Sequence, residues 1–410
     1  MNNIQDKNNK YCTGCGGCVQ VCPVNAIIYR INTDGFFEAF VDESKCISCG
    51  KCKKVCSKFA NYESRSIKEG ELLSARSKNE EVLKTATSGG IAYEIAEYGI
   101  KNGYKILGTI YDYDKNIAKA VIINNIDELQ EIKGSKYIQS KTDIAIKQLL
   151  EDCKKDKNAK YIIFGTPCQI AGISNVLKLQ NVLNEVIKVD LFCHGVPSYI
   201  IWNKYLEQVK NKFNLKQISE CNFRSKHYGW HQYCIELKDV NGNTAYLDDG
   251  KSEFYKLFFD NMLLNKSCYD CIYRKDKTYA DIRLGDYWGK KYYKNQTGVS
   301  AVLINTNKGK NVINKILEQI EIIDKGDIKD FLKVQSTEKY SNEESNLEFW
   351  KNGKIEEKNL KEIINEYRKK MTHTQKLKVT VKDIMGKISP KCKYNIKKIY
   401  YSVENKRRIK

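Results

Sequence analysis

The sequence predicts a mixed α/β (α+β) fold, in which a small cysteine-rich module precedes a larger mixed-sheet domain and a basic helical tail. Three observations lead to this prediction. Eight of the sixteen cysteines lie in two runs within the first sixty residues, strand-like and helix-like segments alternate from Leu72 onward, and the chain beyond about Val334 is charged and helical in pattern. With 410 residues, of which 41% are hydrophobic, the chain is long enough to bury a sizeable core.

The two cysteine runs have the spacing by which a short loop wraps thiolates around a cubane iron–sulfur cluster. They read Cys12-x2-Cys15-x2-Cys18-x3-Cys22-Pro23 and Cys46-x2-Cys49-x2-Cys52-x3-Cys56. In two-cluster modules the fourth cysteine of each run crosses to the other cluster. We therefore assign one 4Fe-4S cluster to Cys12, Cys15, Cys18 and Cys56, and the second to Cys46, Cys49, Cys52 and Cys22. The segments 26–31 and 36–41 are predicted strands, which completes a bacterial-ferredoxin-like module over residues 1–61.

Two alternative uses of these cysteines are less well supported. A four-cysteine zinc site is one alternative, but two complete C-x2-C-x2-C-x3-C runs favour clusters. A disulfide framework is the other, but it leaves the spacing within a run free, whereas metal ligands must converge from one tight loop. The polar segment Met1 to Lys10 shows no signal peptide and no apolar run is long enough to span a membrane, so we expect a cytoplasmic protein with reduced cysteines.

The region after Leu72 alternates between predicted strands and helices. Strands are predicted at 104–111, 118–123, 161–164 and 186–192, and helices at 91–98, 126–131, 142–153 and 170–177. This alternation favours a largely parallel sheet with functional loops at the strand carboxyl ends. A predicted hairpin, 233–237 and 244–247, indicates that the domain is mixed. We divide the domain into an N-terminal part, residues 72–155, and a C-terminal part, residues 156–333, and assign residues 334–410 to the basic helical tail.

Four further cysteines occupy predicted loops. Cys168 follows one strand, Cys193 follows the next, and the pair Cys268-x2-Cys271 lies further along the chain. If the pair is brought over the two strand ends, the four thiolates complete a third site, although buried free cysteines explain the spacing as well. The remaining cysteines lack such a context and are expected to be structural: Cys153, Cys221, Cys234 and Cys392.

Seven motifs in this region occur in order and carry a family resemblance. They are Thr87-Ser-Gly-Gly90, Gly134-Ser-Lys-Tyr137, Gly165-Thr-Pro-Cys-Gln169, Cys193-His-Gly-Val-Pro197, Phe223-Arg-Ser-Lys-His-Tyr-Gly-Trp230, Cys268-x2-Cys271 and Asp281-Ile-Arg-Leu-Gly-Asp-Tyr-Trp-Gly289. Together with the N-terminal module, over residues 10 to 320, the chain resembles the coenzyme F420 hydrogenase/dehydrogenase beta-subunit family with a fused two-cluster ferredoxin domain.

The resemblance implies a mixed-sheet flavin/iron–sulfur domain that contains FAD. In that family electrons pass between iron–sulfur clusters and the flavin, and from there to or from coenzyme F420 or another organic acceptor. The resemblance also implies that Cys168, Cys193, Cys268 and Cys271 hold a third 4Fe-4S cluster beside the flavin.

Several residues of these motifs are candidate cofactor contacts. Ser88, Gly89 and Gly90 open a predicted helix whose N–H groups favour a pyrophosphate, although an ordinary N-cap explains them as well. The chain has no convincing G-x-G-x-x-G fingerprint, which counts against a standard NAD-binding unit. The other candidates of this kind are Thr166, Gln169, Asp286 and Trp288, of which the last two are explained equally by core packing.

Four charged or titratable residues are candidates for more direct roles. Lys136, Arg224 and Lys226 are candidate contacts of a phosphate or an acidic substrate, with simple surface charge as the alternative. His194 follows Cys193 and is a candidate proton donor near the flavin, with a structural hydrogen bond as the alternative. We take His194 and Lys136 as the candidate catalytic residues.

The formal net charge is +20, and the composition of the chain places lysines throughout rather than in one motif. A solvated lysine-rich surface explains this charge, and an acidic partner (a ferredoxin, an anionic cofactor or a membrane surface) is the alternative. The tail from Met371 to Lys410 is strongly basic and is expected to be an amphipathic helix or a loosely ordered segment rather than a docking arm. We expect ferredoxin or another redox partner protein and a small organic acceptor, but no nucleic acid and no integral membrane segment.

Three functions are consistent with these sequence features. The leading prediction is an iron–sulfur flavoprotein oxidoreductase that passes electrons between 4Fe-4S clusters and FAD, to or from F420 or another organic acceptor. The alternative is an electron-transfer subunit that carries electrons between ferredoxin and a partner enzyme and has no substrate of its own. The third, a cysteine-rich zinc protein that binds an acidic polymer, predicts a colourless protein with stoichiometric zinc.

Overall fold

Two cysteine loops and one hairpin form the N-terminal module. In the computed structural model, which describes residues 2–5, 11–60, 64–335, 340, 348–349, 354–389, 392 and 394–396, strands β1 (Ile27–Ile31) and β2 (Phe37–Val41) pair antiparallel. Gly35, at a φ of +80°, makes the turn between them. The 3-10 helix η1 (Gly17–Val21) and helix α1 (Lys51–Val55) end the two cysteine loops. The two predicted strands are therefore confirmed.

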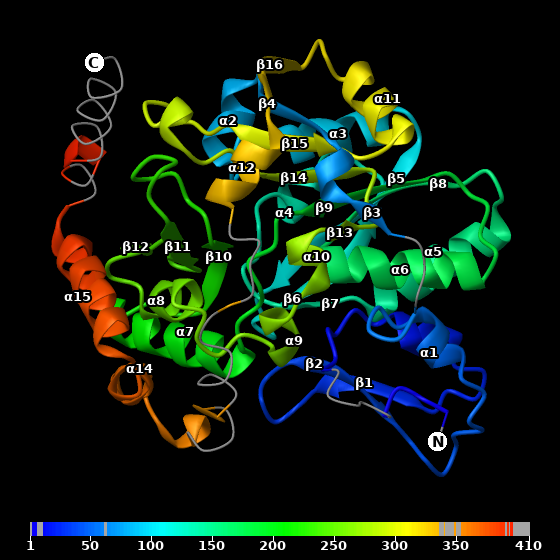
Figure 1. The fold of residues 1–410 in the computed structure, drawn as a ribbon, viewed down its shortest axis with the longest axis horizontal. Coiled ribbons are helices and arrows are strands. Elements are labelled where there is room, and N and C mark those ends of the chain that lie inside the picture. The colour runs from blue at the N-terminus through cyan, green and yellow to red at the C-terminus, as the bar shows by residue number, and fades with distance from the viewer. Residues whose placement is uncertain are drawn as a thin grey trace.

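A nine-stranded mixed sheet forms the centre of the second domain (Figure 1). Its strand order is β16 (Ile320–Gly326), β4 (Glu71–Ser77), β15 (Ser300–Ile304), β14 (Ile282–Asp286), β9 (Val186–Leu191), β8 (Lys160–Phe164), β5 (Tyr104–Asp112), β6 (Ile117–Ile123) and β7 (Ser140–Lys141). The pairs β14–β9, β9–β8, β8–β5 and β6–β7 are parallel, and the other four pairs are antiparallel.

The prediction of a largely parallel sheet is wrong, because half of the strand pairs are antiparallel. β6 returns directly beside β5, and β15 pairs with β4, more than two hundred residues earlier in the chain. The predicted hairpin exists as β11 (Cys234–Asp239) and β12 (Thr244–Asp248), but with β10 (Ile218–Asn222) it forms a separate three-stranded sheet. The mixed fold class is confirmed. The antiparallel strands of the large sheet, however, are not those of the predicted hairpin.

Helices cover both faces of the large sheet. Helices α3 (Ile91–Lys101) and α11 (Asn307–Lys315) pack on one face, through residues such as Ile95 and Val312. Helices α5 (Asp143–Lys155) and α6 (Pro167–Leu179) pack on the other face, and the N-terminal module packs against these two helices in turn (Figure 1). Shorter helices border the sheet: α2 (Glu80–Thr85), α4 (Leu129–Ile132), α12 (Ile328–Val334), η2 (Ile67–Glu69) and η3 (Lys290–Tyr292).

An aromatic core joins the three-stranded sheet to the two helices that flank it in the sequence. Helices α7 (Tyr199–Phe213) and α8 (Glu253–Phe259) pack together around Trp202, Tyr205 and Phe254, which are fully buried. The tail adds η4 (Ile355–Glu357), α14 (Leu360–Lys369) and α15 (His373–Lys387). The short elements α9 (Lys266–Tyr269), α10 (Ile272–Lys275), β13 (Lys277–Thr278) and β3 (Arg65–Ser66) lie near the N-terminal module.

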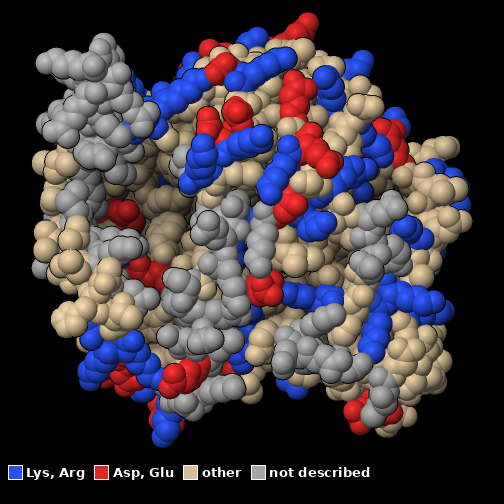
Figure 2. Space-filling model, viewed as in Figure 1, with Lys and Arg blue, Asp and Glu red and all other residues tan. Residues whose placement is uncertain are grey.

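The remaining predicted elements agree with the structure to within a few residues, except that the helix predicted at 126–131 is the four-residue α4. The tail is helical where the structure describes it, whereas the predicted boundary at residue 61 and the basic end, 397–410, lie outside the described residues. None of the helices in the described ranges is long and apolar enough to cross a lipid bilayer. Figure 2 shows Lys and Arg side chains scattered over one face among acidic ones, as a lysine-rich surface predicts.

A buried ion pair fixes the centre of the sheet. Arg283 on β14 lies opposite Asp190 on β9, and its guanidinium donates two hydrogen bonds, of 2.7 and 2.6 Å, to that carboxylate. Thr278 donates a third, at 3.1 Å, and both charged side chains are inaccessible to solvent. Because an uncompensated buried charge is costly, this pair holds β9 and β14 in one register.

We expect Arg283→Met to lower the free energy of unfolding by about 3–5 kcal/mol, because Asp190 would be left buried without its cation. Urea unfolding under argon, followed by tryptophan fluorescence, measures this change. The control is Arg76→Met, which removes a cross-strand pair with Glu321 at 2.7 Å that is open to solvent. We expect the control to cost only about 0–1 kcal/mol, and equal losses in the two variants would contradict the role of the buried pair.

Candidate functional site

The four thiols of the first cysteine set (Cys12, Cys15, Cys18 and Cys56) lie close together, with Cys15 and Cys18 buried and Cys12 and Cys56 half-buried. Burial raises the pKa of the Cys18 thiol well above its usual range, and the charges of Cys12, Cys15 and Cys56 raise it further. Burial and then the charge of Cys15 raise the pKa of Cys56 to about 12. The backbone N–H of Gly14 donates to the Cys12 sulfur at 3.3 Å. Four crowded thiols that resist ionisation suit a site where bound iron would supply the compensating positive charge.

The second cysteine set (Cys22, Cys46, Cys49 and Cys52) surrounds one small cavity. The N–H of Ala26 donates to the Cys22 sulfur at 3.2 Å, and the Asn3 amide donates to the Cys46 sulfur at 3.5 Å. Cys49 is exposed, so this set reaches the surface of the molecule. In both sets, the last cysteine of each run lies with the first three of the other run. The cluster ligands themselves remain a prediction.

The third cysteine set (Cys168, Cys193, Cys268 and Cys271) also lines a single small cavity. Cys168 lies in the first turn of α6, after β8, and Cys193 follows the neighbouring parallel strand β9. An isolated bridge between Pro197 and Leu264 brings the later pair alongside. The buried Arg274 lines the same cavity and donates to the Cys268 carbonyl oxygen at 2.7 Å. A cation beside four thiolates suits an anionic cluster.

Helix α6 connects the first and third cysteine sets. Cys168 and Gly172 are one helical turn apart and share a face of α6. A Cβ atom at Gly172 would lie 2.6 Å from the Cys15 sulfur, so only glycine allows this approach. The hydroxyl of Thr142, the residue before α5, donates to the Cys15 carbonyl oxygen at 3.0 Å and holds the module in place.

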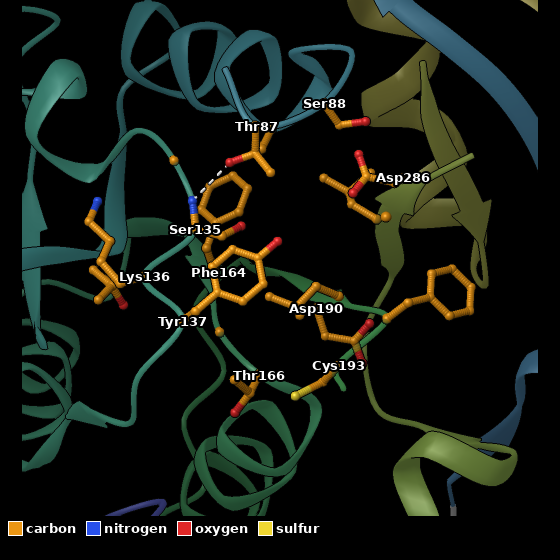
Figure 3. A pocket seen from close by; sticks show the side chains of 18 of the residues that line it. Thr87, Ser88, Ser135, Lys136, Tyr137, Phe164, Thr166, Asp190, Cys193 and Asp286 are labelled. Carbon is orange, nitrogen blue, oxygen red and sulfur yellow. Dashed lines mark hydrogen bonds between the residues drawn. The ribbon is translucent and has the colours of Figure 1, made fainter. Parts of the chain in front are cut away.

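A pocket of about 410 Å³ lies beside the third cysteine set. It opens at the carboxyl ends of the parallel strands β8, β9 and β14, where ligands of open α/β sheets bind. Figure 3 shows Phe164 and Tyr137 inside it, Ser88 and Asp286 at one end, and Thr166 with Cys193 at the other. Its size falls within the range of about 300–1,000 Å³ that is typical of ligand sites.

The loop before α3 forms the polar end of the pocket. Ser88, Gly90 and the first residues of α3 line it, and no described side chain caps that helix terminus. Gly89 does not line the pocket but is held against the sheet, because its N–H donates to the Ser300 hydroxyl at 3.0 Å. A Cβ atom at Gly89 would lie 2.6 Å from the Ala75 carbonyl oxygen.

Lys226 lies behind this loop rather than in the pocket. Its ammonium donates to the carbonyl oxygens of Leu83 at 2.6 Å and Ser88 at 2.7 Å, and also to that of Thr297. Burial lowers the pKa of Lys226 to about 7. Three carbonyl acceptors occupy the ammonium, so the structure places Lys226 as a support for the loop that carries Ser88.

Arg224 and two tryptophans form a wall behind the Asp286 side of the pocket. Trp288 lines the pocket and stacks on Trp230, with ring centroids 4.9 Å apart. The Trp230 indole donates to the Asp286 carboxylate at 2.7 Å, and the buried Arg224 guanidinium lies 3.8 Å from that carboxylate. Arg224 also stacks over Tyr233. Arg224 is therefore neither a surface charge nor a pocket-lining residue, and it orients the groups that line the wall.

Thr166, Gln169 and Cys193 line both the pocket and the cavity of the third cysteine set. Gln169 accepts the Thr166 N–H at 2.9 Å in the capping box that begins α6, and its amide donates to the Ser140 hydroxyl at 2.8 Å. The Thr166 hydroxyl lies 3.2 Å from the Cys168 sulfur. A group in the pocket is thus separated from the third set by a single layer of side chains.

The two candidate catalytic residues line the pocket, but their polar atoms already have partners. The Lys136 ammonium donates to the carbonyl oxygens of Glu131 at 3.0 Å and Lys133 at 2.9 Å, and Figure 3 shows it pointing away from the centre of the pocket. Burial lowers its pKa to about 8. The His194 Nε2 atom lies 3.2 Å from the Phe258 carbonyl oxygen, which can only accept, so this nitrogen carries the proton. This contact favours the structural alternative for His194.

Sequence reasoning missed Asp190, Arg283 and Arg274. Asp190 lines the pocket, but its carboxylate is held by Arg283. Arg274 lies three residues after Cys271, and this position close to a cysteine pair was the one available signal.

All sixteen cysteines are free of disulfide bonds. Among the described residues, no group of three His, Cys, Asp or Glu side chains is placed so that it could hold a single metal ion.

Comparison with known proteins extends these observations. Residues 158–328 match the family described as the C terminus of the coenzyme F420 hydrogenase/dehydrogenase beta subunit, and residues 11–60 match the 4Fe-4S dicluster domain. An uncharacterised protein of Methanocaldococcus jannaschii is 24% identical over 75% of this chain and 92% of its own length. The beta subunit of the coenzyme F420 hydrogenase of Methanococcus voltae is 24% identical over 63% of this chain and 83% of its length.

Two further likenesses are more limited. The cysteine module is 49% identical, over 47 residues, to the B component of the Na(+)-translocating ferredoxin:NAD(+) oxidoreductase complex of Acetobacterium woodii, which is 12% of this chain and 13% of that component. A chain in a structure of the F420-reducing nickel–iron hydrogenase complex of Methanosarcina barkeri is 20% identical. It aligns with a TM-score of 0.47 over 68% of this chain and 90% of its own.

A dicluster module docked on an α/β domain defines this protein as an iron–sulfur electron-transfer protein. More particularly, residues 158–328 carry the C-terminal domain of the coenzyme F420 hydrogenase/dehydrogenase beta-subunit family, fused to an N-terminal 4Fe-4S dicluster domain. The resemblance seen in its motifs is thereby confirmed.

We expect Cys168→Ala to lower the iron content of the anaerobically purified protein from about twelve to about eight atoms per chain. The reason is that Cys168 lines the cavity of the third set and not that of the second set, so only one cubane would be lost. Iron and acid-labile sulfide analysis measures the change.

Cys153→Ala is the control, because Cys153 is buried, even more than Cys168, but lies in the apolar core beside α5. The control should keep all of its iron. Full iron content in Cys168→Ala would remove Cys168 from the ligand set, and loss of iron in both variants would indicate general instability.

Proposed function

We propose that this chain is an iron–sulfur flavoprotein oxidoreductase. Electrons from ferredoxin or another redox partner protein reach the N-terminal clusters, pass to a third 4Fe-4S cluster, and reduce FAD in the pocket, which transfers them to F420 or another small organic acceptor. The reverse direction uses the same path. The observation that carries this proposal is the wall shared by the pocket and the third cysteine set, formed in part by Thr166, Gln169 and Cys193.

The residues around the pocket suit FAD. A dinucleotide needs a site for its pyrophosphate, and the uncapped N-terminus of α3 with Ser88 and Gly90 offers N–H groups and a favourable dipole. It also needs an apolar slot for a planar ring, and Phe164, Trp288 and Tyr233 line the pocket. FAD exchanges hydride with an organic molecule and releases its electrons singly to clusters.

The order of exposure along the three cysteine sets supports electron arrival at the second set. Cys49 is exposed and its neighbour Ile47 is 60% exposed, whereas Cys15 and Cys18 of the first set are buried. Lys51 and Lys54, also exposed, flank the second set. An exposed apolar residue with exposed lysines nearby in the sequence, beside a reachable cluster, suits a transient acidic partner such as ferredoxin.

Anaerobic stopped-flow spectroscopy tests the function. We expect reduced ferredoxin to bleach first the cluster absorbance and then the flavin absorbance, and an acceptor from a panel of F420, quinones and unsaturated acids to restore it. Cys168→Ala should keep its FAD but lose at least about tenfold in the rate of flavin reduction, because its third cluster is missing. Cys153→Ala should behave as the wild type.

Two outcomes would contradict parts of the proposal. If the purified protein contains no flavin and binds none, the oxidoreductase proposal is wrong. If ferredoxin reduces the flavin but no acceptor reoxidises it, the chain is an electron-transfer subunit without a substrate of its own, which is the alternative function.

We expect Gly89→Ala to weaken FAD binding by about tenfold, which corresponds to ~1.4 kcal/mol. The added Cβ would meet backbone atoms of Ala75 and Ser300, at 2.6 and 2.7 Å, so the loop that carries Ser88 must move. Flavin released on ultrafiltration measures the change.

Gly103→Ala is the control, because Gly103 lies just beyond the far end of α3 with open space around its Cβ position. Its φ of +77° makes the substitution mildly destabilising, by about 1 kcal/mol. This control should keep its FAD, and an equal flavin loss in both variants would show that helix stability, rather than loop position, governs binding.

A further inference from the structure

Among the described side chains of helix α15 (His373–Lys387), those that pack against the rest of the protein lie on one face. Val379 is 8% exposed, and Asp383, one turn later on the same face, forms an ion pair of 2.8 Å with Arg368 of α14. Lys256 of α8 lies 4.0 Å from the other carboxylate oxygen. These contacts fix the rotation of the helix about its axis. Figure 1 shows α15 along an outer edge of the molecule, beside α14.

The opposite face of α15 carries an aliphatic stripe that is open to solvent. Leu377, Val381 and Ile384 are 67%, 52% and 58% exposed. Their spacing of four and three residues places them within a narrow arc, about half a turn away from Val379 and Asp383. Aliphatic residues on the exterior of a helix normally occur singly, so three in line indicate a surface that binds something.

The chain around this stripe is strongly basic. Residues 371–410 contain twelve Lys and Arg residues and only two Asp and Glu residues, so half of the formal net charge of +20 belongs to the last tenth of the sequence. Lys376, which precedes Leu377, is exposed. An apolar stripe and a basic segment in one helix are the two features by which interfacial helices bind anionic lipid surfaces.

We propose that α15 docks the protein peripherally onto an anionic lipid surface, with Leu377, Val381 and Ile384 inserted among the lipids and the basic tail against the headgroups. A nucleic acid would use the positive charge but would leave the aliphatic stripe in water. Surfaces that bind a protein partner are rich in aromatic and arginine side chains. The three exposed residues of this stripe are all aliphatic. The stripe and the charge together therefore favour a bilayer surface, bound without a membrane-spanning segment.

Vesicle flotation with the full-length protein tests this proposal. We expect co-flotation with vesicles of phosphatidylcholine and phosphatidylglycerol, and little with phosphatidylcholine alone. The combined variant Leu377→Ser, Val381→Ser and Ile384→Ser should bind the anionic vesicles at least about tenfold more weakly, because three aliphatic side chains no longer enter the lipid. High salt should weaken wild-type binding as well.

The matched control replaces three aliphatic residues that are just as exposed elsewhere, Leu183→Ser, Ile144→Ser and Val240→Ser, which are 85%, 66% and 59% exposed. This control should bind like the wild type. A second measurement uses Val381→Trp, whose fluorescence should shift to the blue with anionic vesicles because the indole leaves water. The iron content of every variant should equal that of the wild type, which separates a docking defect from loss of the electron path.

Three results would overturn the proposal. The first is failure of the wild-type protein to float with anionic vesicles, including the case in which it binds only DNA or an acidic protein. The second is unchanged binding by the stripe variant. The third is flotation of Val381→Trp without a spectral shift, because the stripe would then not be the surface in contact with lipid.

Discussion

The contact between Cys15 and helix α6 is the constraint on which the proposed electron path depends. Electron transfer between clusters requires their ligands to be close, and α6 provides this by carrying Cys168 at its first turn and Gly172 one turn later. A side chain at Gly172 would separate the N-terminal module from the helix. The position of the module, the capping box at Thr166 and the packing of α6 on the sheet therefore serve one geometric requirement.

Several charges that appear dispensable in the sequence determine the shape of the pocket. Lys226 binds three backbone carbonyl oxygens behind the Ser88 loop, and Arg224 lies behind Trp288 and Asp286. Arg224 is buried, and Lys226 is half-buried with its ammonium on backbone carbonyl oxygens, so neither is a free surface charge. The pocket is consequently held from behind by cations while its lining stays largely apolar, an arrangement that keeps a planar cofactor site rigid.

The sequence predicted local features well because spacing within a loop or helix is a local property. The cysteine runs, the strands around Gly35 and the adjacent positions of Cys168 and Cys193 all follow from short-range patterns. Long-range pairing was not accessible: nothing in the sequence placed β15 beside β4, or Asp190 opposite Arg283, residues 93 positions apart. Burial of Lys226 and Arg224 was equally hidden, because charge alone predicts a surface position.

Cys49 is exposed, whereas no cysteine of the first or third set is, and this difference also determines how this protein would fail in air. Susceptibility of cysteine to oxidation follows thiolate character and solvent access. The set that a redox partner can reach is the one that oxygen reaches first, whereas the sets behind it are shielded by α6 and the sheet. Oxidative damage would thus begin at the outermost ligands and disconnect the protein from its electron donor while the pocket and its supports stayed intact.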